Sequence, residues 1–170
     1  MDVKPILGGL AAGAAATVPM SVAMEGMHRA LPRRERYPLP PRLVTERILT
    51  EKLHLPLGLR REKKMRAATW ASHFAYGAAM GGVYALVEPR LASRLPPGIS
   101  GAAFGAAVWA SSYFGLLPAL DILSPAHRHP PRRNLVMGLS HLVWGAALGA
   151  GVARRHPRDP GERGGGDSPS

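Results

Sequence analysis

The sequence contains no cysteine among its 170 residues. Disulfide bonds, thiolate metal sites and cysteine nucleophiles are therefore excluded. The chain also lacks a Ser-His-Asp order of catalytic residues, a glycine-rich phosphate loop and a zinc-protease helix motif. No catalytic residue can be assigned on these grounds, and the sequence favours a role other than that of an enzyme.

Charged residues are missing from four long windows, although the mean hydropathy of the whole chain is only -0.04. The windows without Asp, Glu, Lys or Arg are residues 5–24, 67–87, 95–120 and 134–153. Each holds about 20 residues or more, enough for a helix to cross ~30 Å of hydrocarbon. A water-soluble, alanine-rich helical protein is the alternative, but such windows leave no polar face for water.

We therefore predict an all-α, polytopic membrane protein with a four-helix transmembrane domain over residues 1–153. The predicted spans are residues 5–27, 67–88, 98–120 and 134–153, with a basic loop at 28–66 and a disordered tail at 154–170. A secretory signal is an alternative for the first span. Against it, the four residues before the apolar run have no net side-chain charge, and the run exceeds the length that a signal needs.

The net charge of +11 is concentrated between the windows. The basic loop and the third connection, residues 121–133, hold 15 Lys and Arg residues, against seven in the rest of the chain. The positive-inside rule then places the loop in the cytoplasm and both termini outside. Expected partners are the bilayer, anionic lipid headgroups or a cytoplasmic protein. Nucleic acid is not expected, because the basic run lacks interleaved aromatic residues for base stacking.

The second and fourth windows contain a sequence repeat. Aligned without gaps, residues 72–82 (SHFAYGAAMGG) match residues 140–150 (SHLVWGAALGA), so that His73 pairs with His141. The first and third windows share a weaker pattern of glycine and alanine. The chain is therefore predicted to form two tandem hairpins, related by an axis along the membrane normal.

Each window also carries one Gly-x-x-x-Gly pair. The pairs are Gly9 with Gly13, Gly77 with Gly81, Gly101 with Gly105, and Gly145 with Gly149. Glycines one turn apart let helix backbones approach closely, which is how helices associate where lipid supplies no hydrophobic drive. Because the spans alternate in direction, all four pairs fall in the outer half of the membrane, where we expect the bundle to be narrowest.

Ionisable side chains fall in the inner half. They are Glu25, His28, His73, His141 and Asp121. An ionisable group costs about 2.5–3.5 kcal/mol at the centre of a membrane by insertion scales, so these groups are expected to face protein or water. We predict a polar vestibule that opens toward the basic loops and handles protons or a solute.

Other interpretations stay open. Each neutral imidazole could simply hydrogen-bond a serine or a backbone group of a neighbouring helix. Glu25 and His28 form a Glu-x-x-His pair, and His73 and His141 could complete a divalent-metal shell with them or ligate haem iron from both sides. No cofactor is otherwise expected. A third class of function is a membrane adaptor whose basic loop recruits a partner.

The early histidine of the second span and the HLVWG motif of the fourth resemble the YagU-like group of small bacterial inner-membrane proteins. The resemblance covers residues 8–151 and rests on the order of spans and on these short motifs. It implies a helical protein of the bacterial plasma membrane, with a link to acid stress, and it implies no reaction. The richness in Ala, Arg, Gly and Pro fits a GC-rich bacterial genome, and a homo-oligomer is compatible with the sequence.

Overall fold

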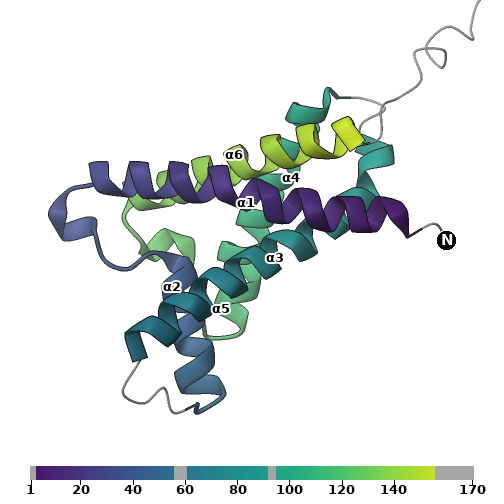
Figure 1. Ribbon diagram of the computed structural model, residues 1–170. Helices are drawn as coiled ribbons and strands as arrows, with labels where there is room; N and C mark the ends of the chain where they lie inside the picture. The colour runs from purple at the N-terminus through teal and green to yellow at the C-terminus, as the bar shows by residue number, and fades with distance from the viewer. Residues whose placement is uncertain (1–2, 56–60, 92–94, 156–170) are drawn as a thin grey trace, which may run out of the picture.

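The computed structural model describes residues 3–55, 61–91 and 95–155, and every regular element among them is a helix (Figure 1). The long helices are α1 (Lys4–Ala30), α3 (Arg61–Leu91), α4 (Pro97–Ala110) and α6 (Pro131–Arg155). The short elements are the 3-10 helices η1 (Arg33–Glu35) and η5 (Ala126–Arg128), the helices α2 (Pro40–Arg47) and α5 (Leu117–Ala119), and the π-helices η2 (Ile48–Lys52) and η4 (Ser111–Leu116). The predicted tail lies outside the described residues from position 156 onward.

Prolines mark where several helices begin and end. Proline occupies the first turn of α1, α2 and α4, where its missing N–H costs no helical hydrogen bond. Leu31, the residue before Pro32, is extended with ψ of 153°, and α1 ends there. α4 runs through η4 into α5, so that Pro97–Ala119 forms one helical segment, called here the α4–α5 rod.

Three of the described helices are long and apolar enough to cross a membrane: α1, the α4–α5 rod and residues Pro131–Arg154 of α6. The predicted span 67–88 lies within α3, which does not reach the same hydropathy. Thr69, Ser72, His73 and Tyr76 lower its mean hydropathy, although none of them is charged. The described residues therefore confirm an all-helical chain with three helices of membrane-spanning character.

Two glycine crossings join the long helices in pairs, α1 with α3 and α4 with α6. At the first crossing, a Cβ atom on Gly13 would lie 2.8 Å from the Cα atom of Gly81. At the second, a Cβ atom on Gly145 would lie 2.8 Å from the carbonyl carbon of Gly101. Real side chains do not approach so closely, so both crossings depend on the absence of a side chain. α1 also packs along α6, which joins the two pairs (Figure 1).

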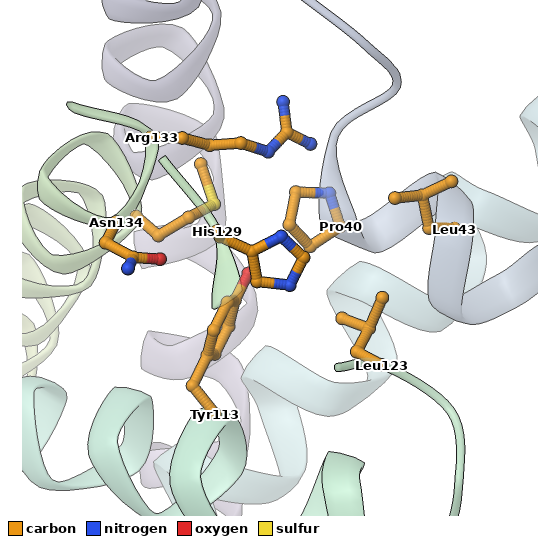
Figure 2. A pocket seen from close by; sticks show the side chains of 8 residues that line it. Pro40, Leu43, Tyr113, Leu123, His129, Arg133 and Asn134 are labelled. Atoms are coloured by element: carbon orange, nitrogen blue, oxygen red, sulfur yellow. The ribbon is translucent and has the colours of Figure 1, made fainter. Parts of the chain in front are cut away.

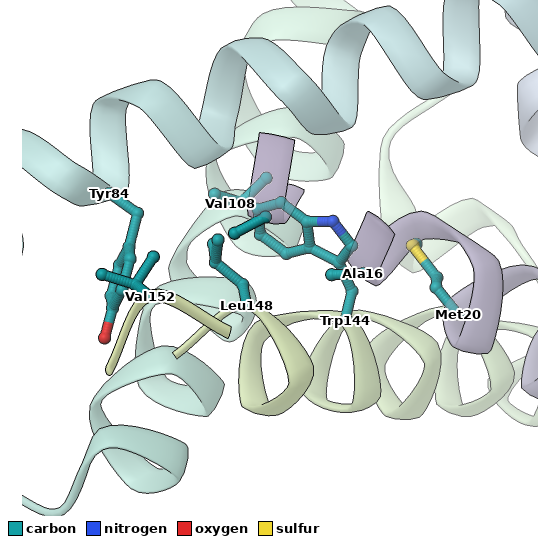
Figure 3. Packing of buried hydrophobic residues seen from close by; sticks show 8 residues of the cluster. Ala16, Met20, Tyr84, Val108, Trp144, Leu148 and Val152 are labelled. Atoms are coloured by element: carbon teal, nitrogen blue, oxygen red, sulfur yellow. The ribbon is translucent and has the colours of Figure 1, made fainter. Parts of the chain in front are cut away.

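Large side chains fill the centre of the bundle beside these crossings (Figure 3). Tyr84 and Leu148 are completely buried. The Phe104 ring lies between those of Tyr84 and Trp144, with centroid distances of 5.2 and 6.2 Å. The Trp144 indole N–H donates a hydrogen bond to the Gly13 carbonyl at 3.2 Å, which ties α6 to α1. The polar ends of the aromatic core residues thus help to set the helix positions.

Arg133 fixes the basic loop to the beginning of α6. Its side chain is 2% exposed and donates to the carbonyls of Tyr37, at 2.9 Å, and Pro38. Its guanidinium lies 3.6 Å from the centroid of the Tyr37 ring, in cation–π geometry. The Tyr37 hydroxyl also hydrogen-bonds Nδ1 of His129 at 3.1 Å. These contacts hold α2 at the wide end of the bundle, where α1 and α3 diverge (Figure 1).

Gly13→Ala is expected to lower the free energy of unfolding by about 1–3 kcal/mol, because the new Cβ meets the backbone of α3 rather than a flexible side chain. Gly26→Ala is the matched control in the same helix. That position faces open space, so alanine should stabilise the helix by about 0.5–1 kcal/mol. Thermal unfolding of both variants in detergent measures the difference, and equal melting temperatures would contradict the crossing.

Candidate functional site

A cavity of about 330 Å³ lies among α1, α2, α3, the α4–α5 rod and α6. This volume is at the lower end of the range for pockets that bind small molecules, roughly 300–1,000 Å³. Four methionines, Met20, Met24, Met80 and Met137, contribute flexible thioether side chains that adapt to irregular shapes. None of the described residues that line the cavity is Lys, Arg, Asp or Glu. The site is therefore apolar in character and has no formal charge in its wall.

His73 and His141 both line this cavity, the first from α3 and the second from α6. Nδ1 of His141 lies 2.8 Å from the carbonyl oxygen of Met137. Because a carbonyl can only accept, Nδ1 donates the hydrogen bond, and in the neutral ring Nε2 is left as an acceptor. His73 is half-buried and makes no hydrogen bond with any other described residue. The cavity therefore offers one imidazole with a defined tautomer and one that no described residue engages by a hydrogen bond.

Several hydroxyl groups of the cavity wall are already hydrogen-bonded. The Thr17 hydroxyl donates to the Gly13 carbonyl at 3.0 Å. Thr45 of α2 and Ser72 of α3 share a hydrogen bond of 2.8 Å. Such contacts satisfy these polar groups within the protein, so that they do not depend on a ligand for their hydrogen bonds.

Tyr113 stands between this cavity and a small hollow of about 10 Å³. Figure 2 shows its ring reaching toward His129 in that hollow, which Arg133 also lines. Its hydroxyl is buried and has no hydrogen-bond partner among the described residues. A buried hydroxyl without a partner costs about 1–3 kcal/mol, so Tyr113 is a place where the site departs from ordinary packing. Residue spacing gave no sign of it.

The π-helix η4 shapes the cavity wall within the α4–α5 rod. It carries Ser112, Tyr113 and Leu116, which all line the cavity. A π-helical turn holds more residues than an α-helical one, and such turns are common at functional sites. Ile48, the first residue of the other π-helix, η2, lines the cavity as well.

The other three predicted vestibule residues do not line the cavity. Glu25 is exposed and accepts a hydrogen bond of 3.1 Å from Arg29, one turn further along α1. His28 pairs with the Tyr37 carbonyl at 3.3 Å. Asp121 is exposed in the turn after α5, with φ of 53°. The predicted group of five is thus reduced to the two histidines.

The direction of the opening also differs from the prediction. The vestibule was expected to open toward the basic loop, but Pro40, Val44 and Thr45 of that loop form part of the cavity wall. The loop covers this side because Arg133 and His129 hold its backbone and Tyr37 against the third connection and α6. Sequence spacing alone could not place α2 there, since the contacts join residues far apart in the chain.

The same geometry bears on the alternative of a metal site formed by Glu25, His28, His73 and His141. Among the described residues, no group of three or more His, Asp or Glu is arranged to hold a metal ion. Glu25 and His28 lie outside the cavity that His73 and His141 share, so the four do not form one ligand shell. Ligation of haem by the two histidines alone stays a prediction.

No protein-family model matches this chain, and no curated protein or solved structure matches it either. The resemblance to the YagU-like group therefore stays a prediction from span order and short motifs. The function has to be inferred from the cavity and from the helices that surround it.

Proposed function

We propose that this chain is a multi-pass membrane protein that binds a small molecule in the cavity between its helices, with His73 and His141 as recognition groups. One observation carries the proposal: histidines at matched positions of the two sequence repeats line the same cavity. A concave, mostly apolar site with a few polar groups is typical of ligand binding. No carboxylate among the described lining residues orients either imidazole, which favours binding over acid–base catalysis.

In this proposal α3 crosses the membrane together with the three more apolar helices, so that α1 with α3 and α4 with α6 form two tandem hairpins. Three of the four polar residues that lower the hydropathy of α3 have hydrogen-bond partners within the protein, and His73 has none among the described residues. Thr69 donates to the Met65 carbonyl at 2.8 Å, and Tyr76 hydrogen-bonds Ser112 at 3.0 Å. Polar groups that are satisfied internally are tolerated at membrane depth. The glycine crossing packs α3 directly against α1, which supports a membrane-crossing orientation for both helices.

The charge distribution supports an orientation for the four spans. The basic loop and the third connection lie at the same end of the proposed hairpins and carry 15 of the 22 Lys and Arg residues. We place this end in the cytoplasm, both termini outside, and the protein in the plasma membrane of a bacterium.

The adaptor alternative receives less support from the contacts of the basic loop. Four of its arginines lie near glutamates, in the pairs Arg29–Glu25, Arg42–Glu62, Arg47–Glu51 and Arg61–Glu46. These exposed pairs contribute little to stability, but they neutralise part of the charge that an acidic partner would recognise. The loop is also engaged with α6 and with the cavity wall, which ties it to the cavity rather than to an external partner.

Cysteine labelling tests whether α3 crosses the membrane. The natural chain has no cysteine, so Arg34→Cys and Leu95→Cys each introduce one exposed thiol, before and after α3. In intact cells a membrane-impermeant maleimide is expected to label Leu95→Cys but not Arg34→Cys, and to label both after lysis. Labelling of both positions in intact cells, or of neither, would place them on one side and contradict the four-span arrangement.

Native mass spectrometry of the protein purified from membranes tests binding. The wild-type protein is expected to carry a small molecule that is lost from the His73→Ala/His141→Ala variant. Each lost hydrogen bond should cost about 0.5–1.5 kcal/mol, or roughly 2- to 10-fold in affinity. His127→Ala is the matched control, because His127 is exposed and does not line the cavity. An unliganded wild-type protein, or equal retention by the double variant, would refute the proposal, and a haem absorption band would favour the redox alternative.

A further inference from the structure

The exposed part of the cavity wall lies on α3 and on the α4–α5 rod. Tyr76 of α3 is 40% exposed, and Leu116 of the rod and Leu120, directly after the rod, are 51% and 50% exposed. The wall residues Trp144 and Met137 of α6 are buried by contrast. The cavity is therefore accessible from the side, between α3 and the rod, rather than from the glycine crossings.

α3 and α4 contact each other much less than either contacts its hairpin partner. Hydrogen bonds from two tyrosines of α3 reach the α4–α5 rod across the gap between them. Tyr84 bonds Ser100 at 2.8 Å in the buried core, and Tyr76 bonds Ser112 of η4 at 3.0 Å beside the cavity. Breaking a single hydrogen bond costs little free energy, so a rotation of the Tyr76 side chain would widen the gap easily.

Large exposed apolar side chains surround this side of the protein. Val83 and Leu86 of α3 and Phe114 of the rod are all more than 40% exposed. In the proposed bilayer arrangement such side chains contact lipid, because no water is present at that depth. The gap between α3 and the rod then connects the cavity with the hydrocarbon rather than with the cytoplasm.

The lining chemistry restricts what can enter by this route. A phosphate or carboxylate headgroup would be buried without an opposite charge, because the described wall has no Lys or Arg. The Nε2 atom of His141 can accept a hydrogen bond from a hydroxyl, and His73 provides a second ring that has no hydrogen-bond partner among the described residues. A hydrocarbon chain gains little by moving from lipid into an equally apolar cavity, so these head-group hydrogen bonds would select the ligand.

We infer that the cavity binds an uncharged, single-chain amphiphile with a hydroxyl-bearing head, which enters sideways from the bilayer between α3 and the α4–α5 rod. This inference rests on the proposed function and specifies its ligand class and route. The methionines and leucines of the wall hold the chain, and the two histidines hold the head.

Trp144 provides a reporter inside the cavity, because it is 3% exposed and belongs to the wall. The chain has three tryptophans, so Trp70→Phe/Trp109→Phe leaves Trp144 as the only one. The probe is 1-(9,10-dibromostearoyl)glycerol, whose bromines quench indole fluorescence on contact. The matched probe is 3-bromopropane-1,2-diol, which has the same kind of head without the chain. The long-chain probe is expected to quench Trp144, and the short one to leave its fluorescence unchanged.

Each other outcome has a distinct meaning. Equal quenching by the short probe would show entry from water, which overturns this inference while leaving the proposed binding function in place. Equal quenching by dibromostearoyl lysophosphatidic acid would overturn the claim of an uncharged head. No quenching by any probe would overturn the inference as a whole, and native mass spectrometry then decides separately whether the proposed function fails with it.

Two further measurements guard against a damaged reporter variant. Unbrominated monostearoylglycerol should raise the melting temperature of the wild-type protein in detergent, whereas glycerol should not, and the absence of a shift would count against the inference. Leu116→Phe narrows the gap and should slow quenching of Trp144. Leu142→Phe is its control, at a similarly apolar exposed position of α6 outside the cavity, and should not change the rate. Equal rates in the two variants would contradict entry between α3 and the rod.

Discussion

At each of the two glycine crossings, a side chain on one helix would occupy the place of a backbone carbonyl on the other. A Cβ atom on Gly9 or on Gly81 would overlap the carbonyl oxygen of the facing glycine, and the same holds for Gly101 and Gly145. In lipid, helices gain no hydrophobic free energy by associating, so close packing of this kind has to supply the attraction. Because the backbones meet at these points, the bulkier residues beyond them keep the helices apart, and the cavity lies in the space that results.

The sequence repeat shows why this arrangement brings two histidines together. His73 precedes Gly77 by four residues, and His141 precedes Gly145 by four residues. His73 therefore stands about one turn from the first crossing, whereas His141 itself lies at the second, where a Cβ atom on Gly105 would meet its carbonyl oxygen. The second crossing is thus offset by about one turn from the first, but α1 also packs along α6, and both imidazoles line the same cavity. The repeat, which can be read without a structure, pairs the two histidines, but the register of each crossing depends on contacts between helices.

Other features depend on contacts that no local pattern contains. Arg133 is one of several basic residues in the third connection, and only its burial against Tyr37 and Pro38 separates it from exposed Arg132. The basic loop contains the short helices α2 and η2, and their place in the cavity wall follows from that long-range clamp. Glu25 lies at a similar predicted depth to the histidines, but depth along a span does not determine the direction in which a side chain points. The lower hydropathy of α3 comes from its polar residues, because a hydropathy value counts each polar side chain without regard to its hydrogen-bond partners.

The most direct test of the account is whether His73 and His141 face one cavity in the membrane-embedded protein. His73→Cys/His141→Cys introduces the only two thiols in the chain, and a short bifunctional methanethiosulfonate should link them, as seen by mass spectrometry after proteolysis. His28→Cys/His141→Cys, with one thiol outside the cavity, should remain unlinked. Efficient linking of the first pair alone is the predicted result. Failure to link it, or equal linking of both pairs, would contradict the shared cavity.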